Sequence, residues 1–204
     1  MFCVAARGRG GEKMADYLLK STKGALVRTP EECDRHIKAY LESNPGIRDY
    51  FRRVRMVLMR DRRLVNSWGR IWSVGDDRYQ DDLYRKAYGW MPPSEAAGLI
   101  NSGWKALHRM AKDKGWKVKV HAQVHDELLM STIPEEIYEI CCLLYSELTI
   151  TREYRLFPMD TPISLSVPVE FKVGRTWKGE KEWKGLPPKD ELVETTTRIV
   201  KETT

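Results

Sequence analysis

The chain has 204 residues, enough for one domain with a substantial core or for a domain with a small appendage. Its 35 basic and 29 acidic side chains give a formal charge of +6, which favours a polyanionic partner only weakly, and its four cysteines lack the spacing of a zinc site or a disulfide framework. No apolar run approaches the roughly 20 residues that span a bilayer, and Arg7 and Arg9 lie where a signal peptide has its apolar segment, so we expect a cytoplasmic protein without a membrane anchor.

The first part of the chain is weakly patterned up to its first helix signal. After a glycine-rich start, residues 14–19 have apolar side chains for at most two helical turns. Thr29-Pro30-Glu31-Glu32 then combines a helix N-cap, a proline in the first turn and acidic residues. This combination predicts a helix that ends near Ser43.

A second helix is predicted from Pro45 to about Arg60, with one apolar and one basic face. The basic face includes Arg48, Arg52 and Arg55. Such a face suits contacts with phosphates, although the solvated side of an amphipathic helix is the more common explanation.

The middle of the chain is predicted to contain two short strands and an interrupted helix. Residues 64–67 and 70–74 have the pattern of strands. Helical spacing follows from residue 76, and the glycine and prolines of residues 89–93 predict a break before the helix restarts over residues 94–112.

A hairpin comes next and presents two carboxylates. Residues 117–122 alternate, and an apolar run resumes at Leu128, so two strands meet at His125-Asp126-Glu127. A polar turn is the simplest explanation for this pair. However, the neighbours are apolar, and two carboxylates held near a buried sheet need a cation or another positive group. A magnesium ion beside a phosphate meets that need with oxygen ligands.

The remaining segments complete the pattern. Residues 132–135 repeat the cap, proline and acid signal, which predicts a helix that covers the sheet. Residues 149–162 are expected to form a loop, and residues 165–173 a strand with Pro168 at a sheet edge. The polar tail over residues 185–204 is expected to be disordered.

His121, His125 and Asp126 also invite a zinc hypothesis, with the protein as a metal-dependent hydrolase. A helical metalloprotease motif places Glu directly after the first His, whereas Ala122 stands here and the local pattern is a strand. The zinc hypothesis is therefore the least favoured.

The hexapeptide Gln123-Val124-His125-Asp126-Glu127-Leu128 resembles the third conserved motif of family A DNA polymerases, the group of bacterial DNA polymerase I and T7-type phage replicases. Four other segments resemble that family in the same order: residues 44–51, 65–70, 85–100 and 168–177. Agreement in order and spacing over roughly residues 28–178 is far more specific than one short motif.

The resemblance implies an α+β fold in which an antiparallel palm sheet carries the carboxylate hairpin, backed by long helices, next to a partial helical fingers region. It implies the following division of the chain: residues 1–27 as the end of a nucleotide-binding fingers segment, residues 28–63 as the remaining fingers helices, residues 64–184 as the palm, and residues 185–204 as a tail.

The resemblance also assigns roles. Asp126 is implied to be a catalytic magnesium ligand, and Glu127 its less essential neighbour. His125 is implied to approach the primer terminus, while Gln123 and Arg85 contact primer-template DNA. The implied reaction is in-line attack of a primer 3′-hydroxyl on the α-phosphate of a deoxynucleoside triphosphate, with two magnesium ions.

Parts of the family pattern are missing from these residues. The family's first motif, which supplies the other metal-ligand aspartate, and the cationic half of its second motif, which binds the nucleotide, are not found. Gly89 and Pro93 stand where the family has Asn and Gln. We therefore expect the C-terminal part of a polymerase that does not polymerise alone. It is either a split subunit, as from a phage, that a second polypeptide completes, or a truncated reading frame. The alternative is an inactive remnant that binds primer-template DNA through four arginines: Arg48, Arg52, Arg55 and Arg85.

Overall fold

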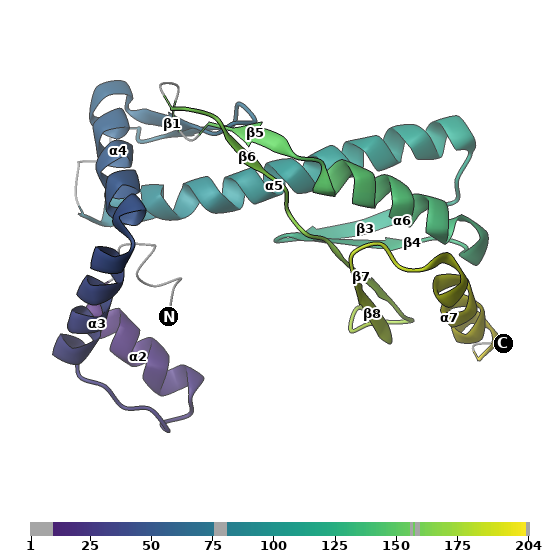
Figure 1. The fold of residues 1–204 in the computed structure, drawn as a ribbon, viewed down its shortest axis with the longest axis horizontal. Coiled ribbons are helices and arrows are strands. Elements are labelled where there is room, and N and C mark those ends of the chain that lie inside the picture. The colour runs from purple at the N-terminus through teal and green to yellow at the C-terminus, as the bar shows by residue number, and fades with distance from the viewer. Residues whose placement is uncertain (1–9, 76–80, 156, 158–159, 203–204) are drawn as a thin grey trace. The chain divides into compact units, whose positions relative to one another are not determined.

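The computed structural model describes residues 10–75, 81–155, 157 and 160–202 (Figure 1). Over these ranges the chain forms six helices and eight strands, and the strands pair as four antiparallel hairpins, which confirms the predicted α+β class. Two compact units, Met1–Ser94 and Glu95–Thr204, divide the chain inside one long helix. Of the helices in the described ranges, none combines the length and the apolar character needed to cross a membrane.

The first unit opens with three helices: α2 (Gly11–Ser21), α3 (Pro30–Ser43) and α4 (Pro45–Asp61). The predicted cap of α3 is confirmed, because the Thr29 hydroxyl accepts from the Glu32 backbone N–H and the Glu32 carboxylate accepts from the Thr29 N–H. Helix α4 also has the predicted bounds to within a residue, with Val54 and Leu58 buried.

Helix α2 is longer than the two turns expected for residues 14–19. Its Met14 packs against Cys33 of α3, and the Gly11 N–H donates to Asp34 Oδ1 at 2.7 Å. A Cβ at position 11 would lie 2.1 Å from a backbone oxygen of α3, so glycine permits this close contact. Packing on α3 therefore stabilises a helix that, at 11 residues, is too short to be stable by itself in water.

Two short strands, β1 (Arg63–Val65) and β2 (Ile71–Ser73), form the predicted hairpin of this unit. The buried Asn66 closes its turn, since Asn66 Oδ1 accepts from the backbone N–H groups of Trp68 and Arg70 at 3.0 and 2.8 Å. The Asn66 amide donates to Ser94 Oγ at 3.2 Å. The helix start expected at residues 76–80 lies outside the described residues.

Helix α5 (Asp81–Lys114) runs through Pro92 without a break, so the interruption predicted at residues 89–93 is wrong. A proline at position 92 has no N–H for the carbonyl of Tyr88, four residues earlier. The Tyr50 hydroxyl donates to that carbonyl at 2.9 Å. A side chain from α4 therefore replaces the missing backbone donor, and the Tyr88 carbonyl is not left unsatisfied.

The second unit contains the rest of α5 and the following elements: β3 (Lys119–Val124), β4 (Glu127–Ser131), α6 (Pro134–Thr149), β5 (Arg152–Tyr154), β6 (Ile163–Leu165), β7 (Glu170–Val173), β8 (Lys181–Lys184) and α7 (Lys189–Lys201). Helix α6 packs closely on α5 at Gly103, where a Cβ would lie 2.7 Å from the Leu148 side chain. Its N-cap is Ile133, so the predicted cap at Thr132 is wrong; the Thr132 hydroxyl donates to the Glu136 carboxylate at 3.2 Å.

The C-terminal part of this unit differs most from expectation. Strand β5 lies within the loop expected at residues 149–162. Of the strand expected at residues 165–173, only the last part forms, as β7, while β6 ends at Leu165. The disorder expected over residues 185–204 is wrong for α7, the yellow helix in Figure 1. Leu192 of α7 packs with Cys141 of α6 and Trp183 of β8, so a single apolar stripe on a polar helix is buried.

Candidate functional site

The carboxylate hairpin has the shortest loop that an antiparallel pair allows. Val124 of β3 pairs with Glu127 of β4, which leaves His125 and Asp126 as the two loop residues. His125 has a φ of +53°, the left-handed region, which costs a non-glycine residue about 1 kcal/mol. Asp126 therefore lies at the tip, and the strand pair of Val124 and Glu127 closes the loop around it.

The surroundings of this tip differ from the expectation of a buried setting. His125, Asp126 and Glu127 are all exposed, because the two-stranded sheet leaves both sides of the tip in solvent. Water solvates the two carboxylates, so their repulsion alone does not demand a cation. Exposure does leave both side chains accessible to a metal ion or a phosphate.

One aromatic side chain contacts this site from the far end of the chain. The indole N–H of Trp177 donates to Glu127 Oε2 at 3.0 Å. Trp177 lies in the turn between β7 and β8, at the end of residues 168–177, one of the segments whose sequence resembles the polymerase family. Sequence reasoning assigned Trp177 no role, because nothing local to either residue signals a contact between them.

The three residues of the zinc hypothesis are not arranged as a metal site. His121 is the extra residue of a bulge between Val120 and Ala122, and its Nε2 lies 2.8 Å from Ser131 Oγ on the neighbouring strand. Across the described ranges, no group of three or more His, Cys, Asp and Glu side chains is placed to hold a metal ion. A zinc hydrolase built on His121, His125 and Asp126 has no support here.

The predicted DNA-binding residues fall into two groups, one in each unit. Gln123 shares the hairpin with the carboxylates, half-buried in β3 opposite Leu128. The arginines belong to the first unit: Arg85 is exposed near the start of α5, and the other three lie on α4, namely Arg48, Arg52 and Arg55.

The three arginines of α4 have different surroundings. Arg48 and Arg52 are more than half exposed and pair with Glu42 and Asp49, respectively. Arg55 is used inside the unit instead: its Nε donates to the Tyr88 hydroxyl, and its guanidinium lies 4.7 Å above the Tyr84 ring.

These contacts bind Arg55 to the aromatic cluster of α5. The hydrogen bond to Tyr88 raises the pKa of Arg55, while burial raises the pKa of the Tyr88 hydroxyl. The role predicted for Arg55 in DNA binding therefore competes with a structural role.

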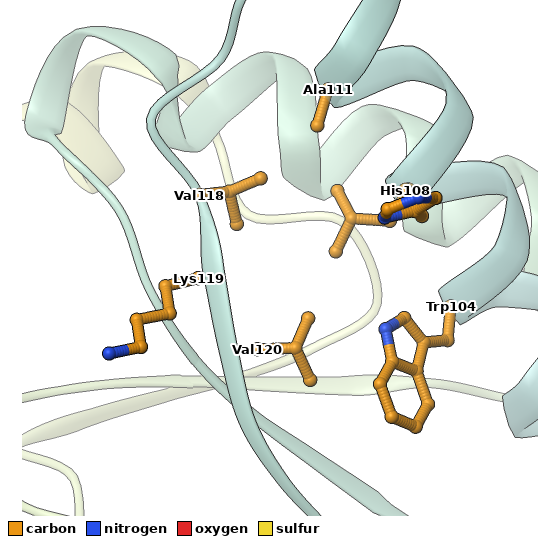
Figure 2. A pocket seen from close by; sticks show the side chains of 7 residues that line it. Trp104, His108, Ala111, Val118, Lys119 and Val120 are labelled. Atoms are coloured by element: carbon orange, nitrogen blue, oxygen red, sulfur yellow. The ribbon is translucent and has the colours of Figure 1, made fainter.

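A shallow apolar hollow of about 310 Å³ lies between α5 and β3 (Figure 2). Trp104 and His108 of α5 face Val118, which directly precedes β3, and Val120 of β3 across it, while Lys119 points to the other side of the strand. Trp104 is 39% exposed, so a large aromatic side chain is left uncovered at this opening.

Comparisons with known proteins place this hairpin in a wider context. The family model described as DNA polymerase family A matches residues 14–179. DNA polymerase I of Bacillus caldotenax is 26% identical over 165 residues, which cover 74% of this chain and 17% of that protein. The POL domain of Pol1 from M. smegmatis, solved in complex with DNA primer-template and dNTP, superposes with a TM-score of 0.60 at 23% identity over 78% of this chain and 27% of that one. The chain thus spans about a sixth of the matched polymerase I and about a quarter of the solved chain.

Proposed function

We propose that this chain, which belongs to DNA polymerase family A, supplies the Asp126-Glu127 part of a two-metal site for template-directed DNA synthesis. The observation that carries the proposal is the tight loop that presents Asp126 at its tip and Glu127 beside it, within the residues that match the family. Strand pairing on both sides of the loop fixes the backbone positions from which the two carboxylate side chains extend.

The donor set suits magnesium but is incomplete. Asp126 and Glu127 offer hard oxygen ligands, which Mg²⁺ prefers in an octahedral arrangement. Two carboxylates are too few to hold two ions, and no larger cluster lies in the parts of the chain that the structure describes. We propose that water, the nucleotide phosphates and an aspartate from outside these 204 residues complete the coordination.

The other hairpin residues are proposed to position DNA. His125 lies next to Asp126, where its imidazole can reach the primer end, and Gln123 lies two residues further along β3. Bound magnesium would stabilise charge on the attacking and leaving oxygens when the primer 3′-hydroxyl reacts with a deoxynucleoside triphosphate. Arg85, Arg48 and Arg52 are proposed to contact phosphates of the primer-template from the first unit.

A second polypeptide is proposed as the source of the first and second motifs. The β3–β4 pair has no third strand within the described residues, so strand edges are available for pairing. The apolar hollow beside Trp104 adds uncovered surface next to β3. Both features suit coverage by a segment of another chain, or by further sequence of a longer one, in the cytoplasm of the cell or, for a phage protein, of its host.

Primer extension with Mg²⁺ tests this function. The chain is assayed alone and with a polypeptide that carries the two missing motifs. These are the first motif, a strand with the sequence Asp-Tyr-Ser, and the second motif, a helix whose Arg and Lys bind the nucleotide. Extension is expected only in the mixture and is expected to be lost with Asp126→Ala, but not with Glu135→Ala, an exposed carboxylate of α6. Robust extension by the unmixed chain would contradict the need for a partner, and activity in Asp126→Ala would contradict the metal role.

The exposed Arg48 and Arg52 favour one alternative, an inactive remnant that only binds primer-template DNA. That function predicts duplex binding that weakens steeply with salt and does not change with magnesium or with Asp126→Ala. Binding of this kind, together with no synthesis in any mixture, would select the remnant over the polymerase subunit.

A further inference from the structure

A single side chain from outside the hairpin holds one of the two candidate metal ligands. Glu127 is exposed, and its carboxylate would otherwise rotate freely in solvent. The Trp177 N–H donates to Oε2 at 3.0 Å, which restricts that rotation and leaves Oε1 for another partner. A hydrogen bond of this kind is how ligating carboxylates are commonly oriented.

The turn that carries Trp177 is itself closely constrained. Strands β7 and β8 pair up to Val173 and Lys181, and the Glu180 N–H donates to the Val173 carbonyl at 2.8 Å. A Cβ at Gly174 would lie 2.7 Å from the Glu180 nitrogen, so a side chain there does not fit. Gly179 has a φ of +71°, which also favours glycine.

The C-terminal elements anchor this turn. Arg175 pairs with Glu202, directly after α7, at 3.3 Å, and with Glu180 at 4.0 Å. Helix α7 and strand β8 are in turn fixed by the buried contact of Leu192 with Trp183. Both elements lie beyond residue 179, where the family match ends.

We propose that Trp177 is a positioning residue that orients Glu127 for metal binding, and that the β8–α7 segment holds Trp177 in place for this purpose. Because Trp177 acts through Glu127, this assignment rests on the metal role proposed above for that carboxylate. It adds a dependence of the metal site on a C-terminal segment outside the matched family region.

Manganese titration of the full ¹⁵N-labelled chain, followed by NMR, tests the assignment without any polymerase activity. Mn²⁺ broadens the backbone amide signal of Asp126 when it binds at the hairpin. Trp177→Phe keeps an aromatic ring but removes the N–H donor. It is expected to raise the Mn²⁺ concentration for half-broadening about tenfold, at the lower end of the loss in metal affinity when a hydrogen-bond partner of a ligand is removed. Trp116→Phe, at a tryptophan of the same unit that precedes β3 at the end of the hairpin away from the tip, is the matched control and is expected to leave it unchanged.

Two further variants keep the test decisive if Trp177→Phe perturbs the fold. Arg175→Gln keeps the Trp177 side chain but removes the ion pair that connects its turn to Glu202 after α7. It is expected to raise the Mn²⁺ concentration for half-broadening by a smaller factor. Glu127→Gln is expected to shift the indole N–H resonance of Trp177. That resonance is assigned by its disappearance in Trp177→Phe.

The outcomes separate the two claims. If Mn²⁺ binds the unmodified chain, and Trp177→Phe and Arg175→Gln bind it with the same affinity, the positioning role is overturned while the metal site stands. If Mn²⁺ does not broaden the Asp126 signal in the unmodified chain, the metal site of the proposed function is overturned, and the positioning role with it.

Discussion

The indole N–H of Trp177 donates to the carboxylate of Glu127 at 3.0 Å, across 50 residues of sequence. This contact connects the hairpin that bears both candidate metal ligands to the turn between the last two strands. A role for the hairpin in metal binding therefore involves Trp177, from a distant part of the second unit, and not the hexapeptide alone.

Asp126 is expected to be the more sensitive carboxylate. In primer extension with the completing polypeptide present, Asp126→Asn should lower the rate at least a hundredfold, because a neutral amide replaces the charge that a magnesium ion needs. Glu127→Gln should lower the rate less, about tenfold, because one oxygen of the Glu127 carboxylate accepts from Trp177 and only Oε1 is left for a metal ion. Equal losses in both variants, with unchanged circular dichroism, would contradict this ranking.

The backbone at His125 predicts an order of stabilities. With φ at +53°, Asn is tolerated in place of His, whereas a β-branched side chain is not. His125→Asn should change the free energy of unfolding by less than about 0.5 kcal/mol, and His125→Val should lower it by about 1 kcal/mol or more. Urea unfolding measures both. His121→Val, at the bulge in the adjoining strand β3, is the comparison variant. A tolerated valine at position 125 would show that the turn adopts another conformation.

Arg55 is expected to matter for stability more than Arg52 does. Lysine keeps the charge but loses the planar group that donates to Tyr88 and lies above Tyr84. Arg55→Lys should lower the free energy of unfolding by about 1 kcal/mol, as expected for a partly exposed contact of this kind. Arg52→Lys should stay within about 0.5 kcal/mol. Urea midpoints decide between them, and equal midpoints would show that the Arg55 contacts contribute little.

The folded tail predicts a large effect of a buried leucine. Leu192 is fully buried between α7 and the core of its unit, whereas Val193 beside it is 40% exposed. Leu192→Ala should therefore lower the free energy of unfolding by about 2–4 kcal/mol, and Val193→Ala by well under 1 kcal/mol. Limited proteolysis near residue 185 gives a second measure. Similar cleavage in the two variants would favour the disordered tail that the composition suggests.

The ion pair between Lys181 of β8 and Glu191 of α7 predicts that stability depends on pH. Lys181 at 2.6 Å, and then the Trp183 N–H at 3.1 Å, lower the pKa of Glu191 below its ordinary value of 4.5. A carboxyl whose pKa is lowered by folding stabilises the folded state fully above its unfolded pKa, and this contribution is lost as the pH falls through the folded pKa. The melting temperature of Glu191→Gln should lie below that of the unmodified chain at pH 7, and the difference should shrink as the pH falls through the lowered pKa of Glu191 and vanish below it. Glu194→Gln, on the exposed side of α7, should show no such convergence.

Signals that act within a few residues were predictable. The capping box at Thr29 and the alternating strands around Asp126 involve neighbours in sequence, so they describe the same local geometry in any tertiary setting. The ordered series of family-like segments predicted the family, which the match over residues 14–179 confirms. The exposure of the two carboxylates was not predictable, because it depends on how many strands flank the hairpin.

Contacts between distant residues decided the rest. Helix α5 continues through Pro92 because the Tyr50 hydroxyl, 38 residues from Tyr88, satisfies the carbonyl that the proline leaves without a donor. Helix α7 forms because Trp183 and Cys141 bury Leu192, although the segment has the composition of a disordered tail. The sequence by itself determined the family and the position of Asp126 and Glu127 at a hairpin tip. Only the tertiary structure brought Trp177 to Glu127, because hydrogen-bond satisfaction and burial depend on which surfaces meet after the chain has folded.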